Sequence, residues 1–249
     1  MKKMNIMMSG LLLSVGTSTL NVQAEENVYK SEGTITYTQG NPPPVVTPPG
    51  SEGPEITEPD VNPTTGPLMI IAATPIDFGV QETTIAAKNY FATDFQTSIK
   101  GSPEEKITTE NFLKFRDLRA TDDHRYKLYA QMTKQFTQNT SQLKGAALSY
   151  SNLRLLTTAA NMENMPAEEE MMLASTLDLV PGIDGVSAGE KELVFENESA
   201  EKGFGTYDIT FGEYEKNSSQ SIKLAVPGNL PIIKGQYVAE ITWTMSDTF

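Results

Sequence analysis

Apolar and polar side chains alternate with a period of two along much of the chain from Leu68 onward. Successive side chains of a strand point to opposite faces of its sheet, so this alternation predicts strands with one buried face. Tyr126, Leu128, Ala130 and Met132, for example, would share one face. The further predicted strands are residues 68–78, 145–156, 175–180, 191–197, 206–211, 222–226 and 237–245.

Residues that favour turns separate these predicted strands. Helical periodicity is weak, and only residues 108–115 and 162–173 are expected to hold a short helical turn or two. Many short strands between frequent turns predict an all-β domain over residues 68–249, built as an antiparallel β-sandwich or a barrel-like sheet. The turn positions are Pro75, Gly145, Pro181-Gly182, Gly203 to Gly205 and Pro227-Gly228.

The composition changes before this domain. Residues 40–67 hold most of the prolines, several glycines and almost no large apolar side chains. Such a segment buries too little surface to offset the entropy that ordering costs, and its proline pairs favour polyproline II. We therefore predict that residues 25–67 form an N-terminal segment with a Pro-rich, disordered linker that acts as a semi-rigid spacer. Within it, residues 28–38 alternate briefly and predict a short strand that the domain recruits.

The first residues have the pattern of a secretory signal peptide. Two lysines precede an apolar run over residues 4–15, and residues 22–24 read as a small-residue cleavage site. The run is shorter than the ~20 residues that span a bilayer, and no later run reaches that length. We therefore expect residues 1–24 to be removed, so that the mature chain begins near Glu25 and contains no membrane span.

The charge of the chain limits its partners. Acidic residues outnumber basic ones by 32 to 19, and the formal net charge is −13 at pH 7. Nucleic acids and anionic membranes should repel such a protein, so nucleic acid is excluded as a partner. Because the chain has no cysteine, we expect neither disulfides nor a lipid anchor, and the core alone must stabilise the fold.

Residues with catalytic or metal-binding chemistry are sparse. The single histidine, His124, lies in a polar stretch and is expected in a solvated loop. A Ser-His-Asp triad would have to use it. Asp122 and Asp123 would hold calcium only if carbonyl groups joined them. We therefore predict no catalytic residue, no metal site and no cofactor, and a protein that is not an enzyme.

Two short stretches carry a resemblance to a known family. Tyr126-Lys127-Leu128 follows Asp117-Leu118-Arg119, and Trp243-Thr244-Met245 lies in the last predicted strand. The chain resembles the WxL-domain surface proteins of Gram-positive bacteria, whose domain carries two Trp-x-Leu motifs, one after an Asp-x-Arg and one in the C-terminal strand. The resemblance covers residues 65–249, and the signal peptide and spacer precede it in the expected order. Gly66, Leu68, Ile70 and Ile76-Asp77-Phe78-Gly79 add to it.

The chain departs from the family pattern at two positions. Tyr126 stands where the first motif has Trp, and Met245 stands where the second has Leu. Tyrosine keeps an aromatic ring with a polar tip, and methionine keeps a flexible apolar volume. Strand packing should survive both changes, whereas a contact that needs an indole at position 126 would not.

The resemblance implies a secreted protein on the extracellular cell surface. It would be held noncovalently on the cell wall, binding peptidoglycan through its C-terminal domain, alongside membrane-anchored companion proteins. The motif residues would then bind peptidoglycan, and nearby residues would support the motifs. The first group is Tyr126, Leu128, Trp243 and Met245, and the second is Asp117, Arg119 and Tyr237.

Alternatives remain open at this stage. Trp243 alternates with Tyr237, Ile241 and Met245, which favours a core position. The alternative is an exposed platform for sugar rings, and the two roles can coexist if the edge of the indole lines a groove. The whole protein would otherwise be a secreted wall-active hydrolase that uses a carboxylate pair. A third possibility is a structural subunit of a surface complex, in which the wall-binding domain is only an anchor.

Overall fold

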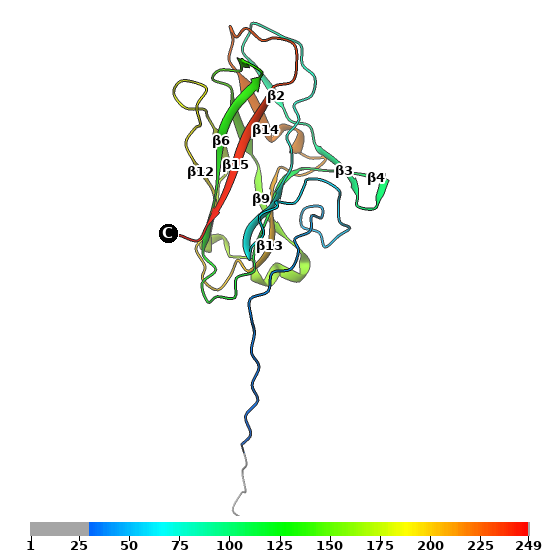
Figure 1. Cartoon of the computed structure of the whole chain (residues 1–249), viewed down its shortest axis with the longest axis vertical. Coiled ribbons are helices and arrows are strands. Elements are labelled where there is room, and N and C mark those ends of the chain that lie inside the picture. Colours follow the sequence, from blue (N-terminus) through cyan, green and yellow to red (C-terminus); the bar gives the residue numbers. More distant parts are fainter. Residues whose placement is uncertain (1–29, 249) are drawn as a thin grey trace, which may run out of the picture. The chain divides into compact units, whose positions relative to one another are not determined.

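Strands dominate the computed structural model, which describes residues 30–248 (Figure 1). The all-β prediction is confirmed. The described helices are three short 3-10 helices, η1 (Ala159–Asn164), η2 (Glu168–Glu170) and η3 (Ser218–Gln220). The strands are β1 (Leu68–Ala73), β2 (Lys88–Phe91), β3 (Phe95–Ile99), β4 (Ser102–Thr109), β5 (Asn111–Asp117), β6 (Tyr126–Gln138), β7 (Ser141–Gln142), β8 (Ala147–Ser151), β9 (Leu153–Thr157), β10 (Met171–Leu173), β11 (Thr176–Leu179), β12 (Glu192–Asn197), β13 (Gly205–Phe211), β14 (Ile222–Val226) and β15 (Val238–Ser246).

Residues 38–248 belong to one compact unit, and residues 30–37 belong to another. The predicted signal peptide, residues 1–24, lies outside the described residues. Residues 30–37 are exposed and form no strand, so the strand predicted over 28–38 is wrong for this part of it.

Three antiparallel sheets and one hairpin build the compact unit. The sheets have the strand orders β1-β5-β13-β9, β10-β12-β6-β15 and β11-β8-β14-β2, with β7 added to β6. Strands β3 and β4 pair as a separate hairpin. The antiparallel prediction is therefore confirmed.

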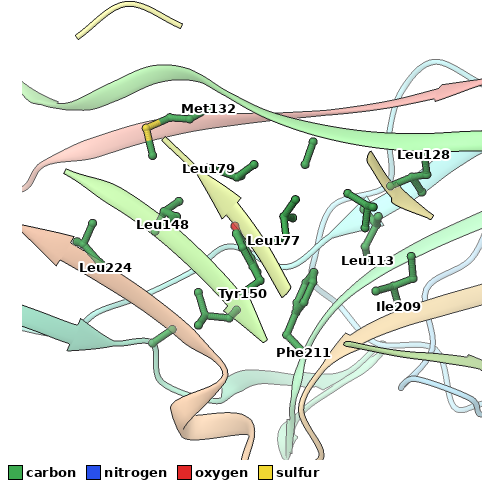
Figure 2. Close-up of a cluster of buried hydrophobic side chains, with 14 of the residues drawn as sticks. Leu113, Leu128, Met132, Leu148, Tyr150, Leu177, Leu179, Ile209, Phe211 and Leu224 are labelled. Carbon is green, nitrogen blue, oxygen red and sulfur yellow. The ribbon is translucent and has the colours of Figure 1, made fainter. Parts of the chain in front are cut away.

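One large apolar cluster draws side chains from all three sheets (Figure 2). On β6, Tyr126, Leu128, Ala130 and Met132 are all buried, which confirms the face predicted from the alternation. Opposing strands add Leu113, Tyr150, Leu177, Ile209, Phe211 and Leu224. The close packing of this cluster is what fixes the positions of β6 and of its neighbour β15.

Strand β5 is buried on both faces, and this explains a wrong prediction. Residues 108–115, expected to hold a helical turn, instead cover the end of β4 and most of β5. A strand that is covered on both sides loses its apolar–polar alternation, so its period of two cannot be seen in the sequence. Residues 162–173 do hold short helical turns, in η1 and η2, before they end in β10.

The second face of β5 lies under the Pro-rich segment. Phe112, on this face, belongs to a smaller apolar cluster that includes Val46 and Ile56 of that segment. The buried Arg116 guanidinium donates hydrogen bonds to the carbonyl groups of Pro42 and Gly66, at 2.8 and 2.9 Å.

A buried ion pair adds to this attachment. Lys114 Nζ lies 2.7 Å from Asp208 Oδ1, and the Gly50 N–H donates to Asp208 Oδ2 at 2.9 Å. Residues 40–67 therefore do not form the predicted disordered linker. The prediction failed because Val46 and Ile56, few as they are, fit an apolar surface that only the folded sheet presents.

Candidate functional site

The two motif stretches lie on neighbouring strands. β6 and β15 pair antiparallel, and Figure 1 shows the green and red strands running along each other. Met245 lies opposite Leu128, and Trp243 lies opposite Ala130. Strand pairing therefore brings together two motifs that are far apart in the sequence.

Tyr126 and Leu128, in the first motif, are fully buried. The Tyr126 hydroxyl donates a hydrogen bond to the Gly203 carbonyl at 3.3 Å, and its ring meets the Phe115 ring edge-on with 6.0 Å between centroids. Burial raises the pKa of the Tyr126 phenol well above its ordinary value, so the group stays neutral and remains a donor. Both residues were predicted to bind peptidoglycan, but a wall polymer cannot reach them in this fold.

Trp243 and Met245, in the second motif, are half-buried and pack against the core cluster. The Trp243 ring is stacked on Phe211, with 6.0 Å between centroids and planes 30° apart. It meets Tyr150 edge-on at 6.1 Å. The tryptophan therefore packs as part of the core, while part of its surface remains exposed to solvent.

Tyr237 lies at the opposite end of β15 from the Asp117 region. Its hydroxyl is 2.8 Å from Ser141 Oγ and accepts a hydrogen bond from the Ile233 N–H at 3.1 Å. Tyr237 therefore fixes the loop that leads into β15.

Asp117, the last residue of β5, is fully buried and organises the turn before β6. Its Oδ1 accepts the Arg119 Nε–H at 3.0 Å, and its Oδ2 accepts Arg119 Nη2–H at 2.8 Å. The His124 Nδ1 lies 2.9 Å from the same Oδ2. Because a carboxylate only accepts, the imidazole carries a proton on Nδ1 toward Asp117, and in the Nδ1–H tautomer Nε2 is an acceptor.

Arg119 connects this turn to the end of the second motif strand. Its Nη1 donates to Asp247 Oδ2 at 3.1 Å, one residue beyond β15. Burial lowers the pKa of the Arg119 guanidinium, but the hydrogen bonds and charges of Asp117 and Asp247 outweigh it, and the net shift is upward. Through Arg119, the Asp-x-Arg stretch thus links the turn before β6 to the end of β15.

The placement of His124 was not foreseen. It was expected in a solvated loop, but it is only 9 % exposed and is held by Asp117. The one hint of this contact in the sequence is that the only histidine lies close to the Asp-x-Arg stretch. Closeness in sequence does not show that the histidine is buried.

An open hollow of about 870 Å³ lies beside this network. His124 and Phe204 both line it, and their rings meet edge-on with 5.4 Å between centroids. The complete lining is Thr38, Gly40, Pro42, Leu118, Arg119, Ala120, Thr121, Asp122, His124 and Phe204.

The loop that carries Phe204 is tied to the segment that carries His124. The buried Asn197 side chain donates to the carbonyl groups of His124 and Lys202, at 2.7 and 2.8 Å. Gly203 has a φ of +94°, and a Cβ there would lie 2.1 Å from Asn197 Nδ2, so only glycine fits. These contacts hold the two lining rings in fixed positions.

Comparison with protein families decides what this domain is. The model of the WxL domain, described as surface cell wall-binding, matches residues 24–248. The chain belongs to the WxL domain family. Comparison with curated proteins and with solved structures gives no significant match.

The match covers nearly the whole chain, including the Pro-rich segment that packs on β5. It therefore does not confirm a WxL domain confined to residues 68–249 at the C-terminal end. The description of the family places the protein at the cell surface and fits the expectation that it binds the wall without catalysis.

Within residues 30–248, no group of three or more His, Cys, Asp or Glu side chains is arranged to hold a metal ion. No helix in the same range is long and apolar enough to cross a membrane.

Proposed function

We propose that this WxL protein is secreted and is held noncovalently on the cell wall by binding peptidoglycan. The observation that carries the proposal is the match of residues 24–248 to a family of surface cell wall-binding domains. The signal peptide predicted at residues 1–24 agrees with it. Membrane-anchored companion proteins, implied by the resemblance, would share the same surface.

The arrangement of the motifs supports this proposal, and from it we infer a role for each motif residue. Tyr126 and Leu128 are buried, so they act by fixing β6. Trp243 and Met245 are half-buried on the neighbouring strand, so of the four motif residues they are the ones with surface left for a ligand. Arg119 and Asp117 hold the ends of both strands together.

The alternative of a wall-active hydrolase finds little support in the carboxylates. Among the described residues, the buried acids are Asp117 and Asp208. Each is bound to a cation, Asp117 to Arg119 and Asp208 to Lys114. A retaining or inverting glycosidase needs two carboxyl groups that face a shared substrate, and these two are engaged elsewhere.

A sedimentation assay with purified peptidoglycan tests the proposal. The mature protein should pellet with the polymer, and the turbidity of the suspension should stay constant. A drop in turbidity would favour the hydrolase. Protein that stays in the supernatant, with no drop in turbidity, would contradict wall binding and would favour a subunit that reaches the surface through its companions.

A further inference from the structure

The hollow beside Asp117 is lined by both apolar and polar side chains. Pro42, Leu118 and the ring of Phe204 supply apolar surface, and Thr38 and Thr121 add hydroxyl groups. Sites for small organic ligands have this character, since apolar side chains supply contact area and a few fixed polar groups set the orientation.

The charges around the hollow do not suit an anion. Arg119 is the one Lys or Arg among the lining residues, and it is already paired with Asp117 and Asp247. Asp122 adds a negative charge to the lining, and the whole chain carries a net charge of −13. Phosphates and peptide carboxylates would be repelled, so an uncharged ligand fits best.

Two lining groups are positioned for such a ligand. Phe204 is 39 % exposed, and the loop that carries it is fixed through Asn197. His124 is oriented by the bond between its Nδ1 and Asp117, and in the Nδ1–H tautomer its Nε2 is an acceptor for a ligand. An aromatic face beside a fixed acceptor is suited to a sugar ring, which has an apolar C–H face and hydroxyl donors at its edge.

We propose that this hollow is a binding site for the uncharged amino-sugar strand of the wall polymer. Phe204 stacks on the apolar face of one sugar ring, and His124 Nε2 accepts a hydrogen bond from a hydroxyl or an acetamide N–H of the sugar. The proposal rests on the proposed function and deepens it, because it assigns recognition to the glycan strand instead of the peptide stem. It also places that recognition beside the Asp-x-Arg stretch.

The single histidine allows a test that needs no mutation. Because the chain has one histidine, its imidazole gives one set of NMR signals, all of them from His124. Titration of the full chain with an N-acetylglucosamine tetrasaccharide should shift these signals in a saturable manner. A synthetic stem peptide should leave them in place. Shifts with the stem peptide alone, or with neither probe, would overturn the proposal.

Matched aromatic variants give a second test. Phe204→Ala should weaken tetrasaccharide binding about tenfold or more, as expected for the loss of a central aromatic contact, and Phe204→Tyr should keep most of it. The control is Phe91→Ala, since Phe91 is 47 % exposed and lies on β2 outside the hollow. Equal affinity of Phe204→Ala and wild type, both folded by circular dichroism, would overturn the proposal.

The sedimentation assay separates this proposal from the proposed function. If wild type and Phe204→Ala pellet equally with peptidoglycan and the tetrasaccharide does not shift His124, the hollow is not the site but wall binding stands. If wild type fails to pellet and the tetrasaccharide does not shift His124, both proposals are wrong. Weaker pelleting of Phe204→Ala together with a shifted His124 signal supports both.

Discussion

Trp243 lies directly opposite Ala130 across the β6–β15 pair, so the single tryptophan of the chain faces a small, fully buried residue. The short side chain of Ala130 leaves room for the indole to lie over the core, where it contacts Phe211 and Tyr150. The pairing of a large side chain with a small one explains how an edge strand contributes to the core.

Trp243→Ala should destabilise the domain by about 2–4 kcal/mol, below the full cost of a buried tryptophan because the side chain is half-buried. Trp243→Phe should keep much of the stability, because a ring remains against Phe211. Thermal melting and peptidoglycan sedimentation measure both variants, and we expect stability and binding to fall together. An alanine variant that melts like wild type but no longer pellets would show instead that Trp243 acts mainly as a sugar platform.

Asp117→Asn should destabilise the domain by about 2–4 kcal/mol, because Arg119 would lose its buried anionic partner and an amide NH2 would replace one of the two oxygens that accept from Arg119 and His124. Urea unfolding measures the change. Asp123→Asn is the matched control, since Asp123 also pairs with an arginine but lies at the surface. Similar losses in the two variants would contradict a special role of the buried carboxylate.

Lys114→Met should be strongly destabilising, by about 3–5 kcal/mol, because Asp208 would stay buried without its cation. The double variant Lys114→Met/Asp208→Leu should recover much of this loss, since it removes the stranded charge. Limited proteolysis supplies an independent measure. Because Asp208 also holds the Gly50 N–H, the single variant should be cleaved faster within residues 40–67 than wild type. Cleavage at the wild-type rate would show that the ion pair does not hold this segment.

Two buried tyrosines should respond oppositely to loss of the hydroxyl. The Tyr150 hydroxyl has no hydrogen-bond partner among the described residues, so Tyr150→Phe should be neutral or stabilising, by up to about 1 kcal/mol. The Tyr207 hydroxyl lies 2.8 Å from the Asn164 carbonyl and 3.0 Å from that of Phe204, so Tyr207→Phe should cost about 1 kcal/mol. Chemical denaturation of both variants tests the contrast, and a destabilised Tyr150→Phe would contradict it.

The same tyrosines predict sensitivity to alkali. Burial raises the pKa of Tyr207 from 10.0 to about 12, and it raises the pKa of Tyr150 as well. A raised folded-state pKa means that the stabilising contribution is complete below pH 10 and is lost as the pH rises toward 12. The free energy of unfolding should therefore fall from pH 10 upward, and it should fall less steeply in Tyr150→Phe. A pH-independent stability in this range would contradict the burial of these phenols.

Retention at the surface can be tested on intact cells. Because we propose noncovalent binding, denaturant or high salt should release the protein without muramidase treatment, and the released chain should begin near Glu25. Immunoblotting and N-terminal sequencing measure the two outcomes. Release by wall digestion alone would point to a covalent link, and a mature chain that begins at Met1 would contradict processing at residue 24.

The sequence by itself determined the fold class. It also determined which side chains are buried in strands that have one face in the core and the other toward solvent. Tyr126, Leu128, Ala130 and Met132 could be assigned to one buried face, because side-chain direction alternates within any strand whatever lies around it. The two motif stretches were equally readable, since a motif is a local pattern of residue types.

Tertiary structure decided which side chains are within reach of a ligand. Burial of His124 by Asp117 and Phe204, and of Val46 and Ile56 on the outer face of β5, depends on surfaces formed by distant parts of the chain. The periodic pattern of a sequence does not reveal such contacts, because it reflects only the spacing of residues within one strand or helix. For the same reason, the sequence identifies Tyr126 as a motif residue but does not show that it is buried. Its burial follows from the packing of three sheets around one core.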